Sequence, residues 1–258
     1  MRCPALARAL CLLLSLAATY GSAESPGPII PRRTSGTPRT MVIGFVGGFV
    51  KHDNAVHSTV QVVEHLRNEY PAGVYVQAFE NRNREKAFQE ILRQLDLDND
   101  GALSAEEKRN ARIIIFGHSW GASETVTLAR RLEKLGIPVL LTIQVDSVSK
   151  IGQNDAVIPA NVGEAVNFYQ PDGIVHGQPQ IRAADPARTQ IIGNFRYDYK
   201  ANPIACEGYP WFDRVLVKAH TEIECDPKVW SQVESLIYSK LSPEARDTAS
   251  DALPLALR

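Results

Sequence analysis

The sequence lacks a surplus of basic residues, an apolar run of membrane-spanning length and any internal repeat. A net charge of -1 at pH 7 argues against a polyanionic partner such as nucleic acid. No apolar stretch reaches the roughly 18 residues that a membrane-spanning helix needs. What remains, with 44% hydrophobic residues in 258, is the composition of a globular protein. The chain is long enough for one large domain, which we expect to be a monomer.

The most apolar stretch lies near the N-terminus. Arg2 and Arg8 precede the run "ALCLLLSLAA" at residues 9–18, and small residues follow up to Ala23. A basic start, a short apolar run and small residues at its end are the features of a secretory signal peptide. We therefore expect residues 1–23 to be a signal peptide and the mature protein to be secreted or periplasmic.

Cysteine is scarce once that segment is set aside. Cys3 and Cys11 lie in the predicted signal peptide, which leaves Cys206 and Cys225 in the mature chain. An even number of cysteines in an oxidising compartment favours a disulfide, here closing a loop of about 20 residues. Two unpaired buried thiols are the alternative.

The apolar patterns divide the mature chain into three parts. Residues 24–40 hold four prolines and no hydrophobic period, which predicts a flexible lead-in. From residue 41 to 242, β-branched runs such as "RIIIFG" alternate with helical stretches such as "SETVTLARRLEKLG". This alternation predicts an α/β domain with a mostly parallel sheet covered by helices on both faces. Residues 243–258 are expected to form a loose tail.

The last third of the domain is less regular. We interpret "NVGEAVNFY" at residues 161–169 as a helix and "RTQIIGNFRYDY" at residues 188–199 as a strand. The stretch "PKVWSQVESLIYSKL" at residues 227–241 has apolar residues near helical spacing, and it predicts an amphipathic closing helix.

The pentapeptide "GHSWG" at residues 117–121 fits the pattern Gly-x-Ser-x-Gly. In this pattern two glycines permit a tight turn from a strand into a helix, which exposes the serine hydroxyl. The strand-like "RIIIF" comes before it and the helix-like "ASETVTLARRLEKLG" follows, as the turn requires. Ser119 is therefore the candidate nucleophile.

A serine hydroxyl needs an imidazole to take its proton. Of the six histidines, four adjoin or precede Ser119, against the chain order Ser, acid, His that is typical of this turn. His176 and His220 remain. We favour His220, because it precedes the closing helix, where the last loop of the sheet would return to the serine.

Two aspartates are candidates for the acid that orients the histidine. Asp146 ends the apolar strand "VLLTIQVD", which places it at the carboxyl edge of the sheet beside the turn. Asp198, in "FRYDY", would end the next strand, the more usual position. Asp146 is favoured, although an aspartate at a strand end is often only a turn former.

Acyl transfer also needs backbone N–H groups that bind an oxyanion. These donors usually belong to the residue after the nucleophile and to the loop after the first core strand. The loop "GFVGGFVKH" fits the second requirement. Trp120 and Phe49 are the expected donors, and Gly47 and Gly48 would let the backbone approach closely.

Together "GFVGGF", "GHSWGA", "QVDSV" and "AHTEIECDP" resemble the α/β-hydrolase superfamily over residues 41–241, in particular its secreted bacterial esterase, lipase and thioesterase-like branch. The resemblance implies hydrolysis of small-molecule or lipid-like esters or thioesters through an acyl-enzyme, with Ser119, Asp146 and His220 as the triad. No insertion is long enough for a large lid, so we expect a small open esterase. Trp211 and Phe212 are candidates for an apolar wall of the acyl site, or for core packing.

The stretch "DLDNDGALSAEE" at residues 96–107 matches the EF-hand calcium loop in full. The expected oxygen ligands are Asp96, Asp98, Asp100, Ala102, Ser104 and Glu107. The EF-hand-like insertion would span residues 86–110, with a short exit helix and no second copy, so we expect a structural ion. In the alternative interpretation the stretch is an acidic helix connector, and Ser104 and Glu107 form a capping box.

Two other classes of function stay open from the sequence. One is a non-catalytic hydrolase-fold protein that binds a ligand or partner and is stabilised by calcium. The other is a calcium-dependent adhesion or docking module.

Overall fold

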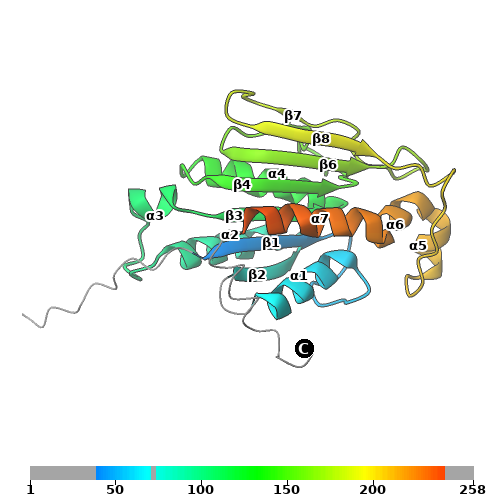
Figure 1. The fold of residues 1–258 in the computed structure, drawn as a ribbon, viewed down its shortest axis with the longest axis horizontal. Helices are drawn as coiled ribbons and strands as arrows, with labels where there is room; N and C mark the ends of the chain where they lie inside the picture. Colours follow the sequence, from blue (N-terminus) through cyan, green and yellow to red (C-terminus); the bar gives the residue numbers. More distant parts are fainter. Residues whose placement is uncertain (1–38, 71–73, 242–258) are drawn as a thin grey trace, which may run out of the picture. The chain divides into compact units, whose positions relative to one another are not determined.

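The computed structural model describes residues 39–70 and 74–241 (Figure 1). The chain divides into two units, Met1–Thr34 and Ser35–Arg258. The first unit lies wholly outside the described residues, and so do the predicted signal peptide (1–23), nearly all of the predicted lead-in (24–40) and the predicted tail (243–258). All described residues belong to the second unit.

A six-stranded parallel sheet forms the centre of this unit, with the strand order β2-β1-β3-β4-β6-β8. The chain runs from β1 outward to β2 and then returns to the other side of β1 as β3. Ligands of open parallel sheets bind at such a reversal of strand order, outside the carboxyl ends of the strands. The strands of this sheet are β1 (Thr40–Val46), β2 (Val74–Glu80), β3 (Ile113–His118), β4 (Val139–Val145), β6 (Val162–Tyr169) and β8 (Gln190–Arg196). A separate two-stranded sheet pairs β5 (Val157–Ile158) with β7 (Arg182–Ala183).

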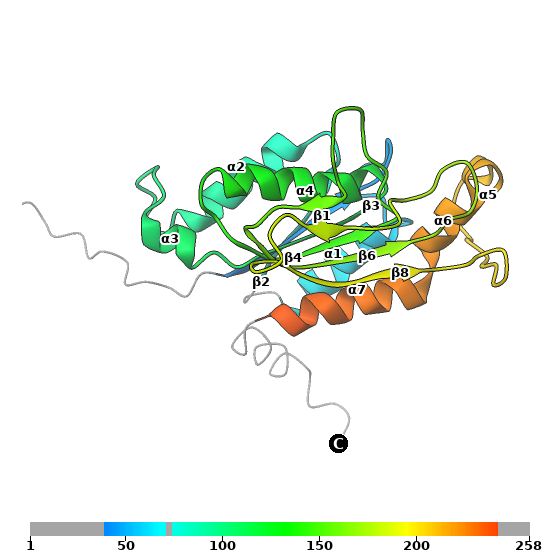
Figure 2. The same ribbon diagram turned by 90° about the horizontal axis from the view of Figure 1, so that it is seen from above.

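Helices cover both faces of the large sheet (Figure 2). On one face α1 and α7 bury Leu66 and Val233 against a first core cluster. On the other face α2 and α4 bury Ile91 and Leu128 in a second cluster. The helices are α1 (Ser58–Glu69), α2 (Arg84–Leu95), α3 (Ala105–Arg109), α4 (Trp120–Glu133), α5 (Trp211–Leu216), α6 (Lys218–Cys225) and α7 (Pro227–Lys240). The expected α/β class, with a mostly parallel sheet and helices on both faces, is confirmed.

One element differs from its expectation. Residues 161–169, interpreted as a helix, contain the strand β6, which pairs with β4 on one side and β8 on the other. Val162, Ala165, Val166 and Phe168 are all fully buried, because the strand lies inside the sheet. A strand buried on both faces loses the alternation of apolar and polar residues, so its local pattern does not distinguish it from a helix. The expected strand at 188–199 and the closing helix at 227–241 are confirmed as β8 and α7.

Cys206 and Cys225 form the expected disulfide, with their Cα atoms 5.7 Å apart. The bridge joins the loop before α5 to the last residue of α6. Among the described residues, no helix is long and apolar enough to cross a membrane.

Replacing both cysteines by serine is expected to lower the free energy of unfolding by about 3 kcal/mol, since the bridge restricts the unfolded chain. For a domain of this size the Tm would fall by on the order of 10 °C. Thermal melts of the double variant and of wild type, with and without reductant, measure this. An unchanged Tm would show that the bridge does not stabilise the fold.

Candidate active site

The turn between β3 and α4 holds Ser119 in a strained conformation. The serine has φ 56° and ψ -126°, outside the regions that residues with a side chain ordinarily occupy. A Cβ on Gly117 would lie 2.7 Å from the Gly121 backbone, and a Cβ on Gly121 would overlap the carbonyl oxygen of Phe45. Both glycines of the motif are therefore needed for the close packing of β3, α4 and β1 that forms the turn.

The structure brings Ser119, His220 and Asp146 into one hydrogen-bonded chain. Nε2 of His220 lies 2.9 Å from Oγ of Ser119, and Nδ1 of His220 lies 2.6 Å from Oδ2 of Asp146. His220 belongs to the helix α6, so the expectation that it lies in a loop is wrong. All three side chains are buried, with His220 the most accessible at 9% exposure.

Asp146 is fully buried and is held by donors that the sequence analysis missed. Its Oδ1 accepts hydrogen bonds from the backbone N–H of Gly177 at 2.7 Å and of Gln170 at 3.2 Å. Its Oδ2 accepts another from Nε2 of Gln170 at 2.8 Å. A Cβ on Gly177 would overlap the Asp146 carboxylate, so the glycine permits this approach. The loop after β6 thus fixes the orientation of a carboxylate that comes from β4.

The alternative acid and base lie elsewhere. The side chain of Asp198 is 42% exposed and pairs with Arg196 at 3.4 Å. His176 is exposed in the loop after β6. Of the candidates considered, His220 is the base that contacts Ser119, and Asp146 is the acid that contacts His220.

The loop after β1 packs against the serine turn. A Cβ on Gly47 would lie 3.0 Å from Cβ of Ser119, and Gly48 has a positive φ of 43°. The rings of Phe49 and Trp120 meet edge to face with centroids 5.5 Å apart. The two residues expected to donate N–H groups are therefore neighbours, and their role as oxyanion donors stays a prediction.

Asn81 holds the same loop from the end of β2. Its Nδ2 donates to the carbonyl oxygen of Gly48 at 2.5 Å and to that of Val46 at 3.2 Å. This residue could not be predicted, because nothing in the local sequence pattern marks an asparagine that contacts a loop more than 30 positions earlier.

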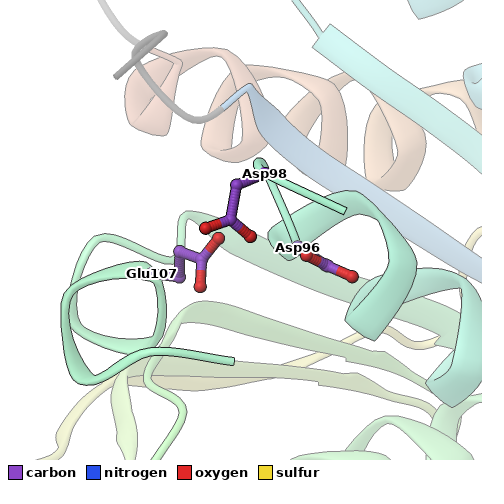
Figure 3. Close-up of side chains that lie close together, drawn as sticks. All are labelled: Asp96, Asp98 and Glu107. Carbon is purple, nitrogen blue, oxygen red and sulfur yellow. The ribbon is translucent and has the colours of Figure 1, made fainter. Parts of the chain in front are cut away.

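The acidic loop lies at the opposite edge of the sheet, before β3. Figure 3 shows the side chains of Asp98 and Glu107 directed toward one another, with Asp96 beside them at the end of α2. Carboxylate oxygens of these three residues lie within 4.8 Å of one another. Asp100, which the sequence places in the same ligand set, is not part of this group, and its Oδ1 accepts from the N–H of Ala102 at 2.8 Å.

Ser104 and Glu107 also form the capping box of α3 that the alternative interpretation expects. Oγ of Ser104 accepts from the N–H of Glu107 at 3.2 Å, and Oε2 of Glu107 accepts from the N–H of Ser104 at 2.8 Å. Capping and metal binding use the same carboxylate, so this geometry is compatible with both interpretations.

Comparison with known proteins gives no family for this chain. No protein-family model matches the sequence, and no curated protein matches it either. The chain is similar to an uncharacterised protein from Pseudomonas aeruginosa, at 10% identity and a TM-score of 0.45, over 81% of this chain and 47% of that one, so it spans about half of that protein's length. An arylesterase structure is similar at 12% identity and a TM-score of 0.43, over 80% of this chain and 76% of that one. A thermostable esterase from Pseudomonas putida is similar at 10% identity and a TM-score of 0.40, over 86% of this chain and 77% of that one. These likenesses are too distant to assign a function to this chain.

The contact between Gly177 and Asp146 generates a prediction. Gly177→Ala is expected to displace the carboxylate and, through His220, to lower the rate of Ser119 labelling by a fluorophosphonate by about 10²-fold, as misplacement by about 1 Å can do. Ile174→Ala, in the same loop, is the matched control, because the Ile174 side chain is 85% exposed. Equal labelling rates for the two variants would contradict the positioning role of this loop.

Proposed function

We propose that the chain is an exported serine hydrolase that cleaves carboxylic esters or thioesters through an acyl-enzyme. The observation that carries the proposal is the hydrogen-bonded chain from Ser119 through His220 to Asp146, at a turn that stores backbone strain. Strain at a single buried serine is costly and is typical of functional sites. The disulfide between Cys206 and Cys225 agrees with an oxidising compartment.

The first half of the reaction would transfer the acyl group to the serine. His220 Nε2 accepts the proton of the Ser119 hydroxyl as its oxygen attacks the carbonyl carbon. The developing oxyanion accepts hydrogen bonds from the N–H groups of Trp120 and Phe49. The imidazolium of His220 then donates its proton to the leaving alcohol or thiol, and water repeats the sequence to release the acid.

Asp146 would keep the imidazole in the tautomer that this reaction needs. With Nδ1–H donated to the carboxylate, Nε2 of His220 carries the lone pair that faces the serine. The hydrogen bonds from Gln170 and Gly177 hold the carboxylate while charge develops on the ring. The site is thus ordered before substrate binds, which is the condition for electrostatic catalysis.

Exposed apolar side chains favour an apolar acyl group. Phe49 is 83% exposed beside the serine turn, and Trp211 and Phe212 of α5 are 68% and 48% exposed. The exposure of these side chains argues against the core-packing alternative for Trp211 and Phe212. The helix α5 precedes α6, which carries His220, so its apolar surface is well placed to contact an acyl chain.

Covalent labelling separates this proposal from a non-catalytic binding protein. Wild type is expected to react with a fluorophosphonate and to hydrolyse p-nitrophenyl esters, because the imidazole activates the serine. Ser119→Ala is expected to abolish labelling and to lower turnover by at least about 10³-fold. Folded wild-type protein that neither labels nor hydrolyses any ester or thioester in a panel of graded chain length would exclude the hydrolase.

We further propose that the acidic loop holds a structural calcium ion. Its three carboxylates converge, and none of them makes an ion pair with a basic side chain of the described residues. The backbone bends sharply at Asn99 and Gly101, with φ values of 57° and 83°. The N–H groups of Asp100 and Gly101 donate to the carboxylate of Asp96 at 3.1 and 3.0 Å. Asp96, Asp98, Asp100, Ala102, Ser104 and Glu107 would supply the hard oxygens that calcium prefers.

Such an ion would stabilise the junction of α3 and β3. Its ligand nearest to Ser119 in the sequence is Glu107, twelve positions earlier. It would supply no chemistry to the reaction, since the loop's own ligands fill its coordination sphere. A calcium ion in this place therefore contributes to stability and, indirectly, to the position of the strand that ends at the serine.

Calcium added to chelated protein is expected to raise the Tm, because a ligand at 100 times its Kd adds about 2.7 kcal/mol to the free energy of unfolding. Glu107→Gln should remove that calcium-dependent rise. Glu106→Gln, an exposed neighbour in the same helix turn, should keep it. A Tm of wild type that does not change with calcium would exclude the ion and favour the capping connector.

A further inference from the structure

Glu224 is a buried carboxylate one helical turn after His220 in α6. Residues four apart in a helix lie on the same face, so the two side chains are neighbours. Oε1 of Glu224 lies 2.6 Å from Nδ1 of His57, and Oε2 lies 3.4 Å from Nδ1 of His118. Burial works against the charged form of Glu224, but the imidazoles of His118 and His57 that face it outweigh burial, and its pKa lies below the usual value. Glu224 is therefore ionised at neutral pH, one helical turn from the candidate base.

His118 contacts both this carboxylate and the candidate base. Its ring centroid lies 4.6 Å from that of His220, with the planes tilted by 35°. Burial lowers the pKa of His118 to about 4, so the ring is neutral at pH 7. Nε2 of His118 is buried and has no hydrogen-bond partner among the described side chains and backbone. A neutral ring of this kind does not screen Glu224 from His220 as water or a cation would.

The geometry points to Glu224 as a second carboxylate that, beside Asp146, stabilises the imidazolium form of His220 and so strengthens it as a base. Glu224 acts through His220 and does not contact the serine, which makes it a positioning residue. Charges buried at this depth interact strongly, because solvent and salt screen them little. The inference deepens the proposed hydrolase mechanism, on which its kinetic consequence rests.

Other titratable groups face Glu224 and His220 from each neighbouring element. They are His57 before α1, His118 at the end of β3, Asp146 after β4, Tyr209 before α5 and Asp213 within α5. Burial raises the pKa of Tyr209, which keeps the phenol neutral, and burial followed by the charge of Glu224 raises that of Asp213. A positive charge on His57 would offset the negative charge of Glu224, because the two side chains are in contact.

Titration of the His220 imidazole by NMR on the folded full chain tests the inference without relying on turnover. Glu224→Gln is expected to lower the midpoint by about one pH unit, the size expected for a charge at this separation in a poorly screened site. Glu222→Gln is the matched control, because Glu222 is equally buried in α6 but accepts from the N–H of Ile204. Its midpoint should equal that of wild type.

The pH profile of kcat/KM provides the kinetic measurement. The fall of kcat/KM at low pH, the acid limb of the profile, reports protonation of the catalytic base in the free enzyme. In Glu224→Gln this limb should move about one unit to lower pH, and the plateau should fall several-fold because the base is weaker. A purely structural role of Glu224 would lower activity without moving the limb.

The outcomes are separable. An unmoved His220 midpoint in folded Glu224→Gln overturns the inference, even if esters are hydrolysed. A lowered midpoint without Ser119-dependent turnover supports it and contradicts the proposed function. Should Glu224→Gln not fold, Glu224→Asp decides: it keeps a carboxylate at this position, so a midpoint close to that of wild type supports the inference and one lowered by about one unit overturns it.

Discussion

The close approach of α4 to β1 is the constraint on which the rest of the site depends. Gly121 lies so near the carbonyl oxygen of Phe45 that any side chain there would overlap it. This contact forces the tight turn after β3 and holds Ser119 at a positive φ. Because β1 and β3 are neighbours at the point where the strand order reverses, the serine is fixed at the centre of the carboxyl edge.

The partners of the serine come from distant parts of the chain and meet at that edge. Asp146 follows β4, the immediate neighbour of β3, and its hydrogen-bond donors follow β6. His220 comes from α6, which is joined by the disulfide at its last residue to the loop before α5. The candidate catalytic residues thus lie at the middle of the sheet, and β2 and β8 are its edge strands.

The parts of this arrangement that depend on local pattern could be predicted from the sequence. The turn at Ser119 needs two glycines at fixed spacing, and a strand-end aspartate such as Asp146 is visible because it follows an apolar run. The strand β6 could not be distinguished from a helix by its sequence. It is buried on both faces because it lies between β4 and β8 and under helices, and these contacts leave no local pattern. Glu224 and His57 contact one another across 167 positions, so no short-range signal connects them. Gln170 and Gly177 were missed for the same reason.

The acidic loop and Ser119 lie at opposite ends of β3, a strand of six residues that is buried throughout. A strand of that length spans roughly 20 Å. An event in the loop reaches the serine only as a displacement of a strand whose neighbours on both sides hold its register. Such a strand transmits a displacement along its length without bending. The loop is therefore suited to set the resting position of the nucleophile once, when the chain folds, and unsuited to switch the site on and off.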